Sequence, residues 1–384
     1  MKVLVSAVRM PFSLAVIRCV GEAGHEVVAT DSIPYAPGMH SHYVIADEVT
    51  VAPRDEPLRY IEEIKKIYEK HKIDLHVPTF EESFYLSRHK DELEKQVPVF
   101  VADFEPLRTL HSKQAFIELC ERIGVKAPKT IIARDQDELR EAAAEISEYC
   151  ARPSFSRGAL QLLTNTGPRA GNLLIDDCEP TAENPWLVQE YIEGEDLCSY
   201  SVAKNGKVGA HLTYEIPIKL DHAEGVRFIT AEVPETLRSA QKIAAELGYS
   251  GHLSFDWKRL DDGSLCVIEC NPRATNGASM MDANAMVSTI VDGAGDEPTV
   301  MPPGRIAQSD LGIVVEILTH QISWGRGLKA LLKVRDLYAE RGDLIPELYQ
   351  FLQFGHNARI AHDKKVGMME AMQGDTCWDG VPIP

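Results

Sequence analysis

The segment from Leu253 to Met281 constrains the fold more than any other part of the chain, because it predicts a β-hairpin that carries a cluster of oxygen ligands. Two β-rich runs flank an Asp-Asp-Gly turn, so Asp256 on the first strand and Glu269 on the second are expected to be neighbours. Glu269 and Asn271 are two residues apart and point to one face of an extended strand. These three side chains suit Mg²⁺, with Mn²⁺ as the alternative. Arg273 follows as a fixed cation where a phosphate could bind.

The composition limits the class of protein and its partners. A chain of 384 residues is long enough for two or three domains. Its net charge of −18 argues against non-specific nucleic-acid binding and against attraction to anionic membranes. The eight cysteines are scattered without a CxxC pair, and there is no run of about 18 apolar residues. We therefore expect a cytoplasmic protein with reduced thiols and with neither nucleic-acid nor membrane partners.

The first three elements predict a Rossmann-like domain. Lys2–Ser6 and Glu26–Asp31 are predicted strands, and Pro11–Glu22 between them is a predicted helix. The turn Ser6–Pro11 lacks the glycines that let a backbone approach a pyrophosphate, which argues against an NAD site. The crevice at the carboxyl ends of these strands is expected to hold part of another substrate instead.

Two adjacent acids follow the next predicted strand, Ile73–Pro78. Glu81 and Glu82 could contact a substrate in the crevice, or they could stabilise the N-terminus of the next helix through its dipole. We expect the second role for at least one of them. Val97–Ala102 is predicted to be the last strand of this domain.

The hairpin also carries a family resemblance. Asp256, followed by Glu-Cys-Asn-Pro-Arg at 269–273, resembles the metal-binding hairpin of the ATP-grasp superfamily. The Asn-Pro-Arg ending is similar to that of carbamoyl-phosphate-synthetase-like and biotin-carboxylase-like members. For the hairpin alone, a surface acidic turn is the alternative. Further pieces in the family's order extend the resemblance over roughly Met1 to Met281.

The resemblance implies a set of phosphate-binding residues. Lys113 matches a lysine that the family carries near a helix start. Arg152 stands before a proline where the family has lysine, and its permanent charge can still bind phosphate bidentately. The loop that follows has one glycine rather than several, so the nucleotide pose is open. The residues of this loop that could close over phosphates are Ser154, Arg157 and Gly158.

An apolar run that ends in Gly-Glu-Asp resembles the adenine-binding connector of the family. The resemblance assigns the ribose hydroxyls to Asp196, with Glu195 as the fallback. An amphipathic edge strand that ends in an acidic turn is the alternative. The residues that would line the adenine are Gln189, Glu190, Tyr191 and Ile192.

The segment Glu215–Phe228 is predicted to be irregular and to lie near the ATP site. A loop there could recognise an acidic co-substrate through His222 or Arg227, although a lone histidine in a loop is more often merely exposed. Asn276 and Gly277, directly after the hairpin, are the other substrate-contact candidates.

We therefore predict an ATP-grasp fold of mixed α/β and α+β class. The predicted parts are a Rossmann-like N-terminal domain (1–104), a small lobe (105–186), a large lobe with the metal hairpin (187–300) and a helical C-terminal extension (301–384). Within the extension, 310–355 is expected to be mostly helical and 374–384 to be a flexible or draped tail. A lid, a homodimer face and a substrate wall all remain open as its role.

The resemblance also implies the chemistry. ATP would activate a small-molecule carboxylate as an acyl phosphate, which an amine then attacks, with release of ADP and phosphate. Arg273 and Asn271 would be the catalytic residues, because they lie where the phosphoryl group is transferred. Two alternatives remain: an ATP-binding protein without turnover, and, less favoured, a dinucleotide-dependent oxidoreductase.

Overall fold

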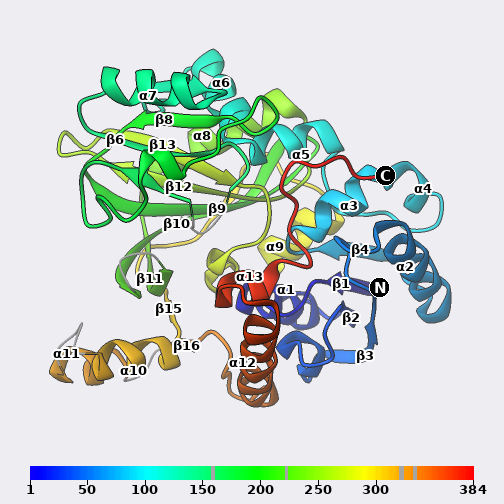
Figure 1. The fold of residues 1–384 in the computed structure, drawn as a ribbon. Helices are drawn as coiled ribbons and strands as arrows, with labels where there is room; N and C mark the ends of the chain where they lie inside the picture. Colours follow the sequence, from blue (N-terminus) through cyan, green and yellow to red (C-terminus); the bar gives the residue numbers. More distant parts are fainter. Residues whose placement is uncertain (157–160, 221–223, 320–323, 332–334) are drawn as a thin grey trace.

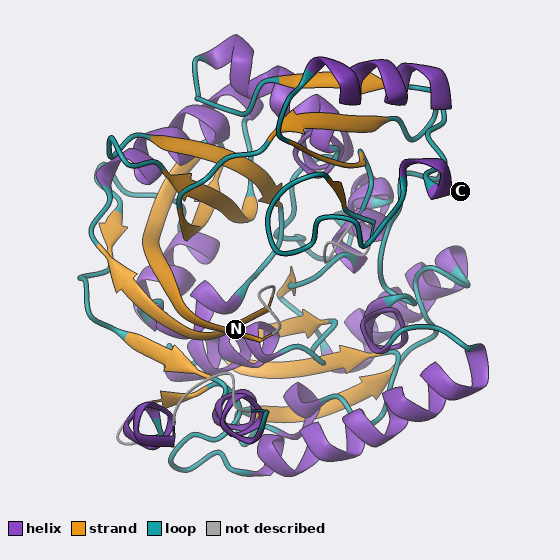
Figure 2. Ribbon diagram, turned by 60° about the vertical axis from the view of Figure 1, so that its left-hand side comes forward, coloured by secondary structure: helices purple, strands orange, loops and turns teal. Residues whose placement is uncertain are grey.

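The described part of the chain folds around three β-sheets (Figure 1). The computed structural model describes residues 1–156, 161–220, 224–319, 324–331 and 335–384. Figure 2 shows the sheets as separate layers with helices packed along them. The fold is therefore a mixture of α/β and α+β parts, as the sequence predicted.

The N-terminal sheet is parallel, in the order β3-β2-β1-β4. The third strand was not predicted, and Val97–Ala102 was wrongly predicted as a strand, since only an isolated bridge joins Val99 to His76. The elements of this part are β1 (Lys2–Ser6), α1 (Pro11–Glu22), β2 (Glu26–Asp31), η1 (Pro37–His40), β3 (Val44–Val49), α2 (Pro57–His71), β4 (Leu75–Pro78), α3 (Glu82–Arg88) and α4 (Lys90–Leu93).

The second sheet, in the order β5-β8-β6-β7, forms the small lobe. Two helices lead into it, and Ser112 caps the second helix by accepting a hydrogen bond from the backbone N–H of Ala115. The elements are α5 (Phe104–His111), α6 (Lys113–Ile123), β5 (Thr130–Ala133), α7 (Gln136–Glu145), β6 (Tyr149–Pro153), β7 (Leu163–Thr164), η2 (Ile175–Asp177) and β8 (Trp186–Glu190). The predicted boundary at residue 186 therefore cuts through β8, which pairs with β5 and β6.

The large sheet has the order β13-β12-β9-β10-β11-β15-β16, and β14 pairs with β10. Asn205 and Gly206 join β9 to β10 with φ of 52° and 77°, the left-handed conformations that a tight hairpin turn needs. The elements are β9 (Glu195–Lys204), β10 (Lys207–Leu220), β11 (Glu224–Ala231), α8 (Pro234–Leu247), β12 (Gly251–Arg259), β13 (Leu265–Asn271), η3 (Asn276–Met280), α9 (Ala283–Val291), β14 (Thr299–Val300), β15 (Ile306–Gln308) and β16 (Arg335–Asp336).

Two differences from the prediction concern this sheet. The segment 215–228 is not irregular over most of its length, because β10 continues to Leu220 and β11 begins at Glu224. A bulge near Ile218 breaks the alternation of side chains that would have identified the strand. The C-terminal extension is also not purely helical, since β15 and β16 join this sheet.

The C-terminal part contains α10 (Asp310–Leu318), α11 (Trp324–Ala330), α12 (Ile345–Lys364) and α13 (Met368–Gln373). Helix α12 packs on η1, where the rings of His40 and Tyr349 stack with centroids 3.4 Å apart. After α13 the chain runs back past α5 to the region of α4, the red segment in Figure 1. The predicted tail is thus draped over the N-terminal part.

The N-terminal sheet and the large sheet share one hydrophobic core. Val5 of β1 and Phe12 of α1 belong to the same buried cluster as Tyr200 of β9 and Met281, which directly follows η3. Beside this core, the backbone N–H of Ala274, shortly after β13, donates to the carbonyl of Thr79, directly after β4, at 3.1 Å. Among the described helices, none is both long enough and apolar enough to cross a membrane.

Candidate active site

The hairpin β12–β13 brings the predicted metal ligands together. Asp256 lies directly opposite Glu269, and Ser254 lies opposite Asn271. The amide Nδ2 of Asn271 donates to Asp256 Oδ2 at 3.2 Å, so the side chains of these two residues touch. Arg273 in turn donates to Asn271 Oδ1 at 3.1 Å. The two carboxylates, the amide and the guanidinium therefore form one continuous cluster.

The two carboxylates of this cluster have opposite pKa shifts. Burial raises the pKa of Asp256, and the neighbouring charge of Glu269 raises it further. Burial also disfavours the charged form of Glu269, but the charges of Arg152 and Lys113 hold the pKa of Glu269 below its usual value. Glu269 is thus the more readily ionised member of the pair.

This ligand set fits a hard divalent cation rather than zinc. In the described part of the chain there is no group of three or more His, Cys, Asp or Glu side chains that could hold a metal. The hairpin offers two carboxylates and one amide oxygen instead, which is a set typical of Mg²⁺ completed by water and phosphate oxygens.

Arg152 joins the small lobe to the large lobe. It lies on β6, and its NH1 donates to Glu269 Oε2 at 2.5 Å, while its NH2 donates to the carbonyl of Ile268 at 3.0 Å. Its Nε is buried and has no hydrogen-bond partner among the described residues. The structure therefore places the predicted phosphate cation directly against a predicted metal ligand, a contact across 117 residues that no local pattern could reveal.

The start of the predicted phosphate loop is held by the N-terminus of α6. The backbone N–H of Lys113 donates to the carbonyl of Ser154 at 3.1 Å, and the two hydroxyls of Ser112 and Ser154 lie 2.9 Å apart. The ammonium of Lys113 donates to the carbonyl of Ser156 at 2.5 Å. Lys113 and Ser154 are thus neighbours in the structure, whereas Arg157 and Gly158 lie outside the described residues.

The predicted adenine connector lies at the end of β8. Gln189 is buried and donates to Thr130 Oγ1 at 3.0 Å, and Glu190 accepts from the backbone N–H of Lys129 at 2.8 Å. The backbone of Tyr191 bonds to the carbonyl of Glu148 at 2.9 Å. Ile192 follows, half-buried, so the chain crosses here from the small sheet toward β9.

Asp196 sits between two lysines. Lys258 Nζ lies 2.9 Å from its carboxylate, and Lys219 forms a second ion pair with it. Burial opposes ionisation of Asp196, but both lysines hold its pKa below the usual value. Glu195, the fallback, pairs with Arg259 at 2.5 Å.

Sequence reasoning did not include Lys258 among the site residues. Asp256 and Lys258 are two residues apart and therefore share a face of β12, a signal that was available in the sequence. Cys198, whose Sγ lies 2.8 Å from Asp256 Oδ1, was also missed, because it comes from a neighbouring strand. Arg273 is flanked by two rings that were not expected either, with its Cζ 4.8 Å from the ring of Phe80 and 5.6 Å from that of Phe12.

The substrate-contact candidates are dispersed. Glu81 is buried near Arg273, at 4.0 Å, and accepts from the backbone N–H of Trp378. Glu82 accepts from the backbone N–H groups of Thr79 and Phe80, so it stabilises the start of α3, the role expected for at least one of the two acids.

Of the other candidates, Gly277 packs against Tyr200, since a Cβ at this position would lie 2.5 Å from the Cβ of Tyr200 and 3.0 Å from its ring carbon Cγ. The neighbouring Asn276 has a buried Oδ1 that no described residue hydrogen-bonds. Arg227 donates to Gln308 and to the carbonyl of Ala330, which ties it to β15 and α11. His222 lies outside the described residues.

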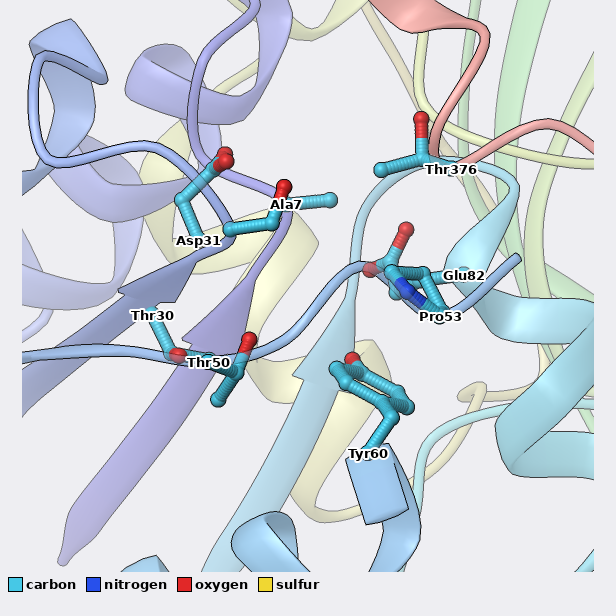
Figure 3. A pocket seen from close by; sticks show the side chains of 9 residues that line it. Ala7, Thr30, Asp31, Thr50, Pro53, Tyr60, Glu82 and Thr376 are labelled. Atoms are coloured by element: carbon cyan, nitrogen blue, oxygen red, sulfur yellow. The ribbon is translucent and has the colours of Figure 1, made fainter. Parts of the chain in front are cut away.

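A small pocket lies at the carboxyl ends of β1 and β2, where the sequence predicted a substrate crevice (Figure 3). Asp31 and Glu82 line it, and Thr376 from the end of the chain lies across from Thr30 and Thr50 in Figure 3. Arg9 forms an ion pair at 2.6 Å with Asp31, one of the residues that line this pocket.

No family model matches the chain. Curated relatives do: the arginine-specific carbamoyl phosphate synthase large chain of Bacillus subtilis is 25% identical over 270 residues, and the carbamoyl phosphate synthase large chain of Deinococcus radiodurans is 25% identical over 266. Each match covers 66% of this chain but only 25% of the relative, so the chain corresponds to about a quarter of those proteins.

Solved structures resemble most of the fold. An N5-carboxyaminoimidazole ribonucleotide synthetase in its ADP complex has a TM-score of 0.64 at 15% identity, covering 83% of this chain and 84% of that one. The biotin carboxylase of Campylobacter jejuni has a TM-score of 0.61 at 16% identity, covering 77% and 72%. These relatives and neighbours are ATP-grasp proteins, and the hairpin sequence predicted the same superfamily. The chain therefore has the ATP-grasp fold, and its resemblance to the ATP-grasp superfamily is confirmed.

Proposed function

We propose that this protein is an ATP-dependent carboxylate–amine ligase. The observation that carries the proposal is the meeting of the two lobes at one cluster. Arg152 from the small lobe contacts Glu269, which lies opposite Asp256 in the large lobe. Such an arrangement supplies positive charge and hard metal ligands to a triphosphate held between the lobes.

The proposed reaction has two steps. A carboxylate oxygen of the substrate attacks the γ-phosphorus of ATP, and the bond from that phosphorus to the β–γ bridging oxygen breaks, so ADP leaves. The amine nitrogen then attacks the acyl carbon, the bond to the phosphate oxygen breaks, and the nitrogen loses a proton. Among the described residues we assign no protein nucleophile, since positioning and charge neutralisation suffice.

Each cluster residue has a proposed role in this reaction. Asp256, Glu269 and Asn271 would hold Mg²⁺, which neutralises charge on the phosphates when bound. Arg273, fixed by Asn271 and by the ring of Phe80, would steady the phosphoryl group during transfer. Asp196 would bind the ribose hydroxyls when a nucleotide displaces one or both of the lysines that now pair with its carboxylate.

The substrates are proposed only as classes. The neighbours include a biotin carboxylase domain of Hydrogenobacter thermophilus in complex with MgADP and bicarbonate, and a phosphoribosylamine–glycine ligase of Thermotoga maritima. We propose a small carboxylate, bicarbonate included, and a small amine. We also keep cytoplasmic localisation as a prediction.

An ATP-binding protein without turnover is the second candidate. The Arg152–Glu269 ion pair favours it, because a cation bound to a metal ligand is less available to a phosphate. A dinucleotide-dependent oxidoreductase has less support, since the β1–α1 turn has no glycine.

Nucleotide binding separates these candidates. Mg-ATP is expected to raise the melting temperature by several degrees at saturating concentration, and NAD is expected to leave it unchanged, because only a ligand that binds the native state stabilises it. ADP formation would then be followed with pairs of carboxylates and amines, and any product weighed by mass spectrometry.

The outcomes of this assay are distinct. Stabilisation by Mg-ATP with ADP release that depends on both substrates supports the ligase. Stabilisation without ADP release across the pairs favours the binding protein, and stabilisation by NAD alone would contradict both.

We propose further that two copies of the chain associate through α12. Six large apolar side chains, five on α12 and one directly before it, are each more than half exposed, and residues 348–358 carry no charge in a chain of net charge −18, so two copies can meet without repulsion. Their exposed area is on the order of 600 Å² per copy, close to the ~800 Å² per partner of a standard interface. The six residues are Leu344, Ile345, Leu348, Phe351, Leu352 and Phe354.

Light scattering tests this association. The wild-type protein is expected to have the mass of a dimer, and Leu348→Glu is expected to shift it to a monomer, because it places a charge in the apolar interface. Leu58→Glu, at a similarly exposed leucine on α2, is the control and should leave the mass unchanged. A monomeric wild-type protein at micromolar concentration would refute the dimer.

A further inference from the structure

The last residues of the chain, Gly374–Pro384, form a strap between the N-terminal part and the small lobe. Asp375 anchors it through an ion pair with the buried Arg9 at 2.6 Å, and Ser32 donates to the same carboxylate at 2.6 Å. Further along, the carbonyl of Cys377 accepts from the hydroxyl of Tyr85 at 3.1 Å. The strap is therefore held by polar contacts with the N-terminal part before it reaches the small lobe.

Trp378 is the centre of the strap. It is 2% exposed, and its backbone N–H donates to Glu81 Oε2 at 3.0 Å. Its ring stacks on Phe84 of α3 with centroids 4.8 Å apart and meets Phe104 of α5 at 5.5 Å. A third contact, edge to face at 5.2 Å, is with Phe155. One side chain thus joins three parts of the chain that are distant in sequence.

Phe155 lies at the start of the segment proposed to cover the phosphates of ATP. It directly follows Ser154, which the N-terminus of α6 holds, and it precedes Ser156, whose carbonyl accepts from the ammonium of Lys113. A change in the position of the Phe155 ring would therefore move the backbone of 154–156 and the ammonium of Lys113, which are the groups proposed to bind phosphate.

Gly380 encloses the same ring from a second side. Its φ is +91°, and a Cβ at this position would lie 2.5 Å from a ring carbon of Phe155. Only glycine combines this left-handed backbone with so close an approach. Two strap residues, Trp378 and Gly380, thus form the seat of the Phe155 ring.

We propose that the strap is a positioning element of the ATP site, and that Trp378 sets the segment 154–156 for phosphate binding by seating Phe155. This inference rests on the proposed use of ATP. Trp378 touches no substrate atom in this scheme, and its effect on the phosphates passes through Phe155 and the backbone beside Lys113. The strap must accordingly favour nucleotides that carry phosphates over those that do not.

Calorimetric titration of the full chain with Mg-ATP and with adenosine tests the proposal. Trp378→Ala is expected to weaken Mg-ATP binding about tenfold, because it removes the aromatic seat of Phe155, and to leave adenosine binding unchanged. Trp378→Phe, which keeps a ring in the seat, should restore most of the loss. Trp324→Ala, at an exposed tryptophan of α11, is the control and should bind both ligands as the wild type does.

Gly380→Ala is a second variant that leaves Trp378 in place. Its added Cβ would clash with the other side of the Phe155 ring. It should reproduce the selective loss of Mg-ATP affinity, and it tests the proposal if Trp378→Ala does not fold. Equal affinity of the variants and the wild type for Mg-ATP, or an equal loss for ATP and adenosine, would overturn the positioning role. A wild-type protein that does not bind Mg-ATP refutes the proposed function itself, which is a separate result.

Discussion

Replacement of Glu269 by alanine is expected to abolish ADP formation while leaving the protein folded. Glu269 lies opposite Asp256 and is the carboxylate that Arg152 holds ionised, so its removal takes away the charge best placed to bind Mg²⁺. It also leaves the guanidinium of Arg152 without its carboxylate. We expect turnover to fall by at least about a hundredfold, the order of effect of losing one strong electrostatic contact in a transition state. Steady-state ADP release and circular dichroism measure the two parts of this result.

Asp261→Asn provides a matched control for this variant. Asp261 lies in the exposed turn of the same hairpin, so its replacement changes the charge of the hairpin without changing the cluster. It should keep wild-type turnover. A Glu269→Ala protein that still forms ADP at the wild-type rate would refute the metal assignment.

Arg152→Ala is expected to lower ATP affinity or turnover by roughly ten- to a hundredfold. A charge-assisted contact is worth about 1.5–3 kcal/mol, which corresponds to that range. The structure adds a second reason, because Arg152 also supports Glu269 through the contact between their side chains. Steady-state kinetics with ATP as the varied substrate measure the Michaelis constant and the turnover number separately.

Arg152→Lys distinguishes the two ways in which Arg152 could act. A lysine keeps the charge but cannot contact Glu269 and the carbonyl of Ile268 at the same time, as the two terminal nitrogens of Arg152 do. Most activity should remain if the site needs only a cation, and more should be lost if both contacts matter. Arg134→Ala, at an exposed arginine of the same lobe, is the control. An Arg152→Ala protein with unchanged kinetics would make the binding-only candidate the stronger one.

The local sequence was sufficient for the hairpin and for the first helix. The turn Asp-Asp-Gly and the spacing of Glu269 and Asn271 determine register and face, because a strand alternates its side chains every two residues. Helix α1 was predicted with its observed bounds, Pro11–Glu22, because a proline favours the first position of a helix.

The sequence was less informative where a strand irregularity or a contact between distant residues determines the structure. The bulge in β10 hid a strand, and β8 was divided wrongly because its partners β5 and β6 are distant in the chain. The lysines around Asp196 come from two other strands, and no pattern along β9 indicates them.

The sequence by itself therefore determined which residues could form an acidic cluster, and the superfamily in which such a cluster occurs. Only the tertiary structure decided that Arg152 faces Glu269 and that Trp378, near the end of the chain, packs against Phe155. The physical reason is the range of the interactions. Turn geometry and strand alternation act between neighbours in the chain, whereas an ion pair between lobes and an aromatic seat depend on the packing of the whole molecule.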